Sequence, residues 1–148
     1  MKGQYRLKQF LLNTFIGTLY GRTIGKLKRR SNQLRVATGS SSLDFLNALT
    51  QQNINYALIR WSEDIEQARD IDIIISDDDL GRLYAICSSG LFAFGKPVDA
   101  FSVNGAKGHN FKTIAYFPPY LAQRMLQQCV EIDGIRKLKP EDEFFALL

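Results

Sequence analysis

The most strand-like stretch of the chain, residues 70–76 with the sequence DIDIIIS, is an isoleucine run that begins with two aspartates. Strand interiors disfavour aspartate, and a buried carboxylate is costly, so these two acids are unexpected. Because side chains alternate between the faces of a strand, Asp70 and Asp72 share one face. The other face, which we expect to point into a core, carries Ile71, Ile73 and Ile75.

Hydrophobic spacing and turn residues predict the elements around this strand. Leu43, Leu46 and Leu49 recur at helical spacing, and we expect them to share one helix face. The predicted elements are a helix at 43–53 capped by Ser41 or Ser42, a strand at 54–60, a loop or helical turn at 62–69, the strand at 70–76, a helix capped by Asp77, Asp78 and Asp79 and ended by Gly90, and a strand at 96–103.

Proline and glycine divide the C-terminal part of the chain. The sequence PPYLAQRMLQQC predicts a helix with proline in its first turn. Asp133-Gly134 is a strong signal for a two-residue hairpin turn. The following KPEDEFFALL predicts another helix, with Pro140 and three acids in its first turn. The sequence stops inside this apolar run, which indicates either that a longer protein was cut here or that the helix docks at the end of the fold.

Together these elements predict an α/β domain of the α+β type, with a small mixed β-sheet flanked by helices. A length of 148 residues with 45% hydrophobic and 23% charged residues suits one soluble globular domain. The two cysteines form no CxxC pair and the chain has one histidine, so the sequence disfavours a zinc site and a structural disulfide. This cysteine usage is typical of a reducing, cytoplasmic setting.

Charge is distributed unevenly along the chain. Residues 1–36 carry nine basic and no acidic side chains, whereas residues 37–148 carry 10 basic and 15 acidic ones. We interpret 1–36 as a basic amphipathic arm, joined through a linker at 32–42 to a domain at 37–148. The arm has three interpretations: it lies on an anionic membrane surface, it binds nucleic acid, or it packs its apolar stripe on the body or on a second copy in a homo-oligomer.

A third aspartate supports the interpretation of the pair as a cation site. Asp99 lies inside the predicted strand at 96–103, between Val98 and Ala100. If this strand lies beside the one at 70–76, Asp70, Asp72 and Asp99 can reach one cation. An all-oxygen ligand set suits Mg²⁺, and two ions are an option for phosphoryl chemistry. The structural alternative is that Asp70 and Asp72 sit at a strand entrance, solvated or paired to Arg60 or Arg69.

The segments NYALIRWSED, RDIDIIISDDDLGRLYAI and KPVDAFSV resemble the nucleotidyltransferase superfamily, with its DNA polymerase beta-like fold. The resemblance covers about residues 42–103, and the C-terminal segment is similar to nucleotidyltransferase-like proteins associated with bacterial surface-polysaccharide genes. It implies that Asp70 and Asp72 are the metal-binding pair and that Asp99 is the third catalytic acid. The implied cofactor is Mg²⁺, and the implied substrates are an NTP and a hydroxyl acceptor.

One element departs from the family pattern. Where the family has Gly-Ser, which lets backbone amides approach the triphosphate, this chain has Arg60-Trp61-Ser62. Ser62 matches the serine, and Arg60 is placed to contact phosphate, so both are predicted to bind substrate. Trp61 stands at the glycine position.

Three functions follow from these features. The first is Mg²⁺-dependent transfer of a nucleoside monophosphate from an NTP to a hydroxyl acceptor, in surface-polysaccharide metabolism. The second is a non-catalytic binding or scaffold module of the same fold, which the altered Gly-Ser element favours. The third is an adaptor that contacts a membrane surface or nucleic acid through residues 1–36, which would place the cytoplasmic protein at the membrane periphery.

Overall fold

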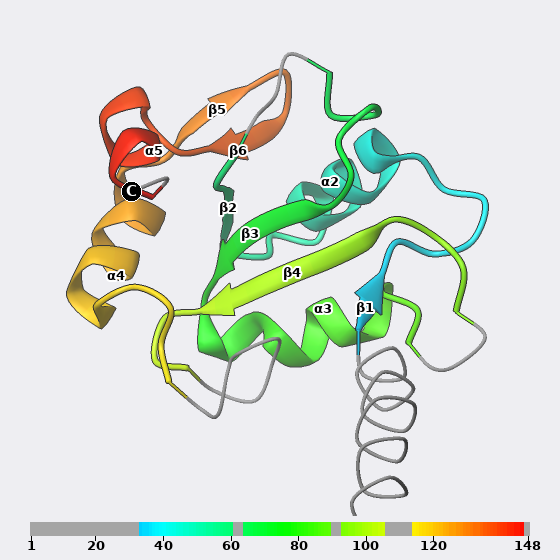
Figure 1. Cartoon of the computed structure of the whole chain (residues 1–148), viewed down its shortest axis with the longest axis horizontal. Coiled ribbons are helices and arrows are strands. Elements are labelled where there is room, and N and C mark those ends of the chain that lie inside the picture. The colour runs from blue at the N-terminus through cyan, green and yellow to red at the C-terminus, as the bar shows by residue number, and fades with distance from the viewer. Residues whose placement is uncertain (1–32, 61–63, 90–92, 106–113, 147–148) are drawn as a thin grey trace, which may run out of the picture.

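The computed structural model describes residues 33–60, 64–89, 93–105 and 114–146 (Figure 1). Within these ranges the chain forms a mixed six-stranded sheet with helices against it, as the sequence predicts. The elements are β1 (Leu34–Arg35), α2 (Ser42–Gln51), β2 (Tyr56–Leu58), β3 (Ile71–Ile75), the 3₁₀ helix η1 (Asp77–Asp79), α3 (Leu80–Ile86), β4 (Pro97–Ser102), α4 (Pro119–Gln128), β5 (Val130–Ile132), β6 (Ile135–Lys137) and α5 (Pro140–Ala146).

The strand order is β1-β4-β3-β2-β6-β5. β3 and β4 are parallel at the centre and are linked through η1 and α3, since parallel neighbours need a crossover connection. β2 pairs antiparallel with β3 and parallel with β6, while β1 and β5 form the two edges in antiparallel pairs. The predicted third strand therefore lies directly beside the strand that carries the aspartate pair.

One face of the sheet packs against α2 and α3. Ile71, Ile73 and Ile75 of β3 are buried there, in one apolar cluster with Leu46 of α2 and Leu83 of α3. Burying an isoleucine side chain stabilises a fold by about 1.5–3 kcal/mol, so this row fixes the register of β3 strongly. The predicted inward face of the isoleucine run is confirmed.

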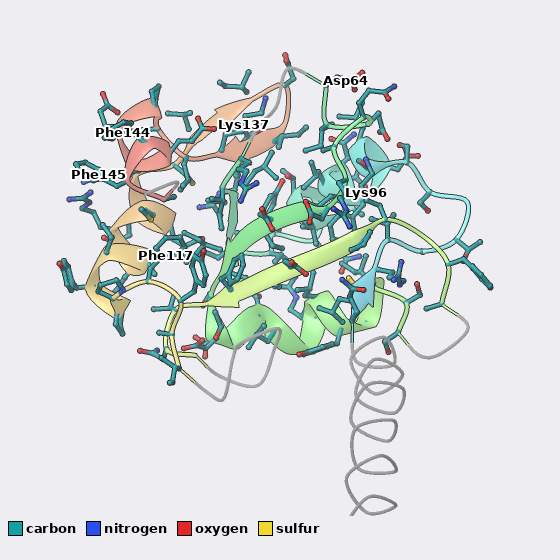
Figure 2. All side chains as sticks on the ribbon, viewed as in Figure 1. Asp64, Lys96, Phe117, Lys137, Phe144 and Phe145 are labelled. Atoms are coloured by element: carbon teal, nitrogen blue, oxygen red, sulfur yellow. The ribbon has the colours of Figure 1, made fainter. Side chains whose placement is uncertain are left out.

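The opposite face is covered by α4 at one end. Ile74 of β3 packs there in a second apolar cluster with Met125 and Leu126 of α4 and with Phe117, which precedes the helix (Figure 2). Asp72 lies two residues before Ile74 and shares its face by strand alternation. Helix α4 therefore packs near the carboxyl ends of β3 and β4, and the acids lie toward the other end of the same face.

Local signals explain where several elements begin and turn. Ser41 caps α2, and the Asp44 side chain accepts from the Ser41 backbone in return, which makes a reciprocal capping box. Pro119 starts α4. Asp133 and Gly134 have φ of 53° and 75°, the left-handed conformation that a tight turn between antiparallel strands requires. The predicted hairpin is confirmed.

The prediction of a linker at 32–42 is wrong in part, because β1 lies within this segment and belongs to the sheet. Leu34 pairs with Val98 of β4, and Leu34 and Val36 are each 2% exposed in the core. The sheet thus includes residues on the arm side of the boundary predicted at residue 36. A run this short has no period that sequence analysis can detect, so only its tertiary pairing identifies it as a strand.

Two helix predictions also need correction. Leu43 is 43% exposed, and Phe45 takes its place in the core beside Leu46. The aspartates 77–79 form η1 and provide no side-chain cap for α3, which ends at Ile86, before the predicted glycine. Instead, the Asp79 carboxylate accepts from the backbone of Asn55 at 2.9 Å, so it ties α3 to the start of β2.

Candidate metal centre

Three aspartates from two neighbouring strands converge on one side of the sheet. Asp70 lies just before β3, Asp72 lies within β3, and Asp99 lies within β4. One carboxylate oxygen from each residue lies within 4.8 Å of the others. The structure therefore brings together the three acids that the sequence selects, closely enough to hold a metal ion.

Strand pairing explains the convergence. Asp72 and Asp99 are direct Cα partners in the parallel pair of β3 with β4. Parallel partners lie about 4.8 Å apart and point to the same face, while Asp70 is two residues earlier on that face. The isoleucine row on the other face fixes this register, because a slip by one residue would turn the acids into the core.

The three carboxylates differ in exposure. The Asp72 side chain is 13% exposed, Asp99 is partly buried with its Oδ1 shielded from solvent, and Asp70 is the least buried. Both burial and mutual repulsion disfavour several ionised carboxylates at one place. A nearby cation counters both effects, so the cluster favours a positively charged partner.

Arg60 is one such partner within the described residues. Its Nε lies 3.5 Å from Oδ2 of Asp72, while its side chain remains 65% exposed. The arginine pairing considered from sequence is thus present at Asp72. An ion pair with one solvent-exposed partner contributes about 0–1 kcal/mol, so Arg60 can leave Asp72 at little cost when a stronger cation or an anionic ligand arrives.

The donor set fits a divalent cation. Oxygens that share one ion must lie within twice the metal–oxygen distance, which is about 4.2 Å for Mg²⁺ and about 5 Å for Ca²⁺. The 4.8 Å limit on the three carboxylate oxygens is compatible with the larger ion directly and with Mg²⁺ after a small side-chain rotation. Three carboxylates also match the hard oxygen ligands that both ions prefer.

The loop that precedes Asp70 is held from two sides. The Glu66 carboxylate accepts from the backbone amides of Ser42 at 3.1 Å and Leu43 at 2.9 Å, at the start of α2. Nζ of Lys96, at the start of β4, donates to the carbonyls of Ile65 at 2.7 Å and Glu66 at 2.9 Å (Figure 2). These contacts connect the loop to α2 and to the start of β4, the strand that carries Asp99, and so they hold the segment that leads to Asp70.

Glu66 gives this arrangement a pH dependence. The amide of Leu43 is the largest of the effects that lower the Glu66 pKa below its ordinary value of 4.5. Since the folded-state pKa is the lower one, ionised Glu66 stabilises the fold above about pH 4.5. That contribution is lost as the pH falls through the folded-state pKa.

We therefore expect Glu66→Gln to remove part of the loss of stability on acidification. Urea unfolding between pH 3 and 7 would measure the free energy of unfolding for wild type and variant. The two should differ most near neutral pH and approach each other in acid. Glu141→Gln, at an exposed residue in the first turn of α5, is the control. Parallel pH profiles for wild type and Glu66→Gln would contradict the loop contact.

Glu66 and Lys96 are not among the site residues predicted from the sequence. Their partners lie 23 to 31 residues away, and no local motif marks such contacts. Of the predicted substrate contacts, Arg60 is placed beside the acids, while Ser62 and the neighbouring Trp61 lie outside the described residues. The arm at 1–36 also lies outside them, except for its last four residues.

Comparison with known proteins adds no relationship: no protein-family model, curated protein or solved structure matches the chain. In the parts of the chain that the structure describes, no helix has both the length and the apolar character needed to cross a membrane. The geometry of the acids and their neighbours is therefore the basis for a functional proposal.

Proposed function

We propose that this protein is a nucleotidyltransferase, dependent on Mg²⁺ or a similar divalent ion, that transfers a nucleoside monophosphate from an NTP to a hydroxyl acceptor. The observation that carries the proposal is the convergence of Asp70, Asp72 and Asp99 from two central strands. The resemblance of the segments around these acids to the nucleotidyltransferase superfamily supports the same reaction. One function accounts for all three carboxylates in otherwise apolar strands.

The three acids share two roles in this proposal. Asp70 and Asp72 hold the cation, which when bound neutralises the triphosphate charge and orients the phosphates. Asp99, the partner of Asp72 across the strand pair, accepts the proton of the acceptor hydroxyl in this proposal. The hydroxyl oxygen then forms a bond to the α-phosphorus, and pyrophosphate leaves with the electrons of the broken bond.

In this proposal, Arg60 binds a phosphate of the nucleotide. Its guanidinium is largely exposed and lies beside the acids, where it can turn from Asp72 to a phosphate oxygen. Arginine recognises phosphate through paired N–H donors, so this exchange replaces a weak ion pair by a stronger contact. Ser62 is the second proposed phosphate contact, on the resemblance alone.

A second candidate is a non-catalytic module of the same fold. The Arg60–Asp72 ion pair favours it, because the arginine already supplies a positive charge to the acid cluster. In that case the site needs no metal, and the pair serves as a structural contact.

Calorimetry separates the two candidates. Each of the four NTPs with Mg²⁺ would be titrated into wild type, into the Asp70→Ala, Asp72→Ala double variant and into Asp78→Ala. Asp78 is the control, because it is an exposed aspartate of η1, beyond the other end of β3. We expect at least one NTP to bind wild type and Asp78→Ala, and to lose about a hundredfold or more in affinity for the double variant. No binding to wild type, or equal binding to all three proteins, would rule out the transferase.

A further inference from the structure

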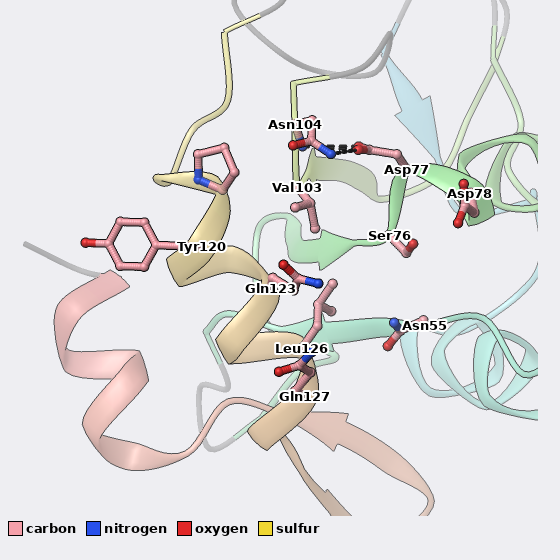
Figure 3. A pocket seen from close by; sticks show the side chains of 11 residues that line it. Asn55, Ser76, Asp77, Asp78, Val103, Asn104, Tyr120, Gln123, Leu126 and Gln127 are labelled. Atoms are coloured by element: carbon pink, nitrogen blue, oxygen red, sulfur yellow. Dashed lines mark hydrogen bonds between the residues drawn. The ribbon is translucent and has the colours of Figure 1, made fainter.

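A hollow lies beyond the carboxyl ends of the central strands β3 and β4. It has a volume of about 410 Å³ and opens between α4 and the turns that follow β3 and β4 (Figure 3). Ser76 and Asp77 form one wall, Asn104 follows β4, and Gln123 and Gln127 of α4 form the facing wall. This volume falls in the range of pockets that bind small molecules, about 300–1,000 Å³.

This pocket is separate from the metal centre. Asp72 and Ser76 are four residues apart along β3, which corresponds to about 13 Å at the rise of an extended strand. The three acids lie near the amino ends of β3 and β4, whereas the pocket lies past the carboxyl ends of these two strands. A small ligand in the pocket would not contact the cation, so the inference below does not rest on the proposed transferase.

One wall of the pocket is held in place before any ligand binds. Both carboxylate oxygens of Asp77 accept from the backbone amide of Asn104, at 3.2 and 3.3 Å, and Oδ2 also accepts from the Asn104 side chain at 2.5 Å. This contact joins the turns after β3 and β4, as the dashed lines in Figure 3 show. Gln123 and Gln127 are one helical turn apart on α4 and therefore face the same side. Such preorganisation lowers the entropic cost of binding.

The chemistry of the lining selects a class of ligand. Amide side chains both donate and accept hydrogen bonds, and the carboxylates of Asp77 and Asp78 accept them. Val103 and Leu126 add an apolar surface. The described residues that line the pocket include no lysine, arginine or histidine, and the two carboxylates among them repel an anion.

A sugar matches this lining well. Each of its hydroxyl groups can donate to a carboxylate or an amide oxygen and can accept from an amide N–H, while its C–H face can lie on the apolar residues. We propose that the pocket is a binding site for a neutral, hydroxyl-rich ligand, a sugar or a related polyol. The residues that recognise it are Asp77, Asn104, Gln123 and Gln127.

Nuclear magnetic resonance on the full chain tests this site. Methyl glycosides of glucose, galactose and mannose would be titrated, each alone, into ¹⁵N-labelled protein. For at least one glycoside we expect shifts concentrated at residues 76–78, at 103–104 and in the glutamine side-chain amides of α4. The Gln123→Ala, Gln127→Ala double variant should lose about tenfold or more in affinity, because two hydrogen bonds are removed. Gln128→Ala, an exposed glutamine outside the pocket, should bind as wild type does.

Several outcomes would overturn the proposal. They are the absence of localised shifts with all three glycosides, equal affinity in the double variant, or binding of inorganic phosphate at the same residues as tightly as the glycosides. Asp72→Asn should leave the glycoside shifts unchanged. This variant changes a proposed metal ligand and its ion pair with Arg60 but no residue that lines the pocket, so a failed metal centre and a failed sugar site give different results.

Discussion

Replacing Asp72 by asparagine is expected to stabilise the metal-free protein and to abolish the stabilisation by divalent ions that we propose for wild type. Carboxylate oxygens within 4.8 Å of one another repel by about 1–3 kcal/mol per ionised pair, for effective dielectric constants between those of water and of a protein surface. Asparagine keeps the shape and removes one charge. Asp72 has two acidic neighbours, and its ion pair with Arg60 offsets at most about 1 kcal/mol of the repulsion that is relieved, so we expect a net gain of about 1 kcal/mol or more.

When metal is added, the order of the two stabilities should be reversed, with wild type more stable than Asp72→Asn. A bound ion present at a concentration of 100 times its Kd should stabilise the folded wild type by about 2.7 kcal/mol. Asp72→Asn, which lacks one of the proposed metal ligands, should show little of this stabilisation. Thermal unfolding with and without Mg²⁺, Mn²⁺ or Ca²⁺ measures both effects, with Asp78→Asn as the control. If Asp72→Asn is instead less stable than wild type and no metal changes the melting temperature of either protein, Asp72 is only the structural partner of Arg60.

Gly95→Ala is expected to have the largest effect on stability of the substitutions considered. Gly95 has a φ of 139°, which side-chain-bearing residues rarely adopt, and an added Cβ would overlap the backbone carbonyl oxygen of Val36. The neighbouring Lys96 carbonyl accepts from the Val36 amide at 2.9 Å, so the backbone has little room to move apart. Backbone strain and overpacking together should cost about 3 kcal/mol or more.

Gly81→Ala is the matched control for this prediction. Gly81 lies in α3, and an added Cβ there would meet no atom within 4 Å. The same substitution should therefore stabilise the protein by about 0.5–1 kcal/mol, because alanine favours the helix. Urea unfolding of both variants gives the comparison. An unchanged free energy of unfolding in Gly95→Ala would show that β1 does not pack against β4 as the structure has it.

Local patterns predicted the centre of the fold well. The alternation of Asp72 with the isoleucines of β3 determined which face the acids take, and the Asp133-Gly134 turn located the hairpin. The sequence predicts that Asp99 lies close to Asp72 only if their two strands are neighbours. The parallel pairing of β3 with β4 meets this condition. Strong periodicity and turn chemistry are local properties, so sequence reveals them.

Features that depend on distant partners were missed. β1 is a strand because β4 lies beside it and because Gly95 permits the approach of Val36. The two residues of β1 carry no sequence signal for either of these contacts. The contact of Asp77 with Asn104 shows the same limit, because the acidic run was assigned to helix capping. The Asp77 carboxylate instead joins two turns and shapes the pocket beyond β3 and β4.

The most direct test of the central claim is a count of bound Mn²⁺. Electron paramagnetic resonance of free Mn²⁺, recorded during titration of the full chain, measures how many ions bind and how tightly. We predict one or two ions per chain for wild type and for Asp78→Asn, and an affinity at least about a hundredfold weaker for Asp72→Asn. Absence of Mn²⁺ binding by wild type, or binding that Asp72→Asn leaves intact, would contradict a metal centre at Asp70, Asp72 and Asp99.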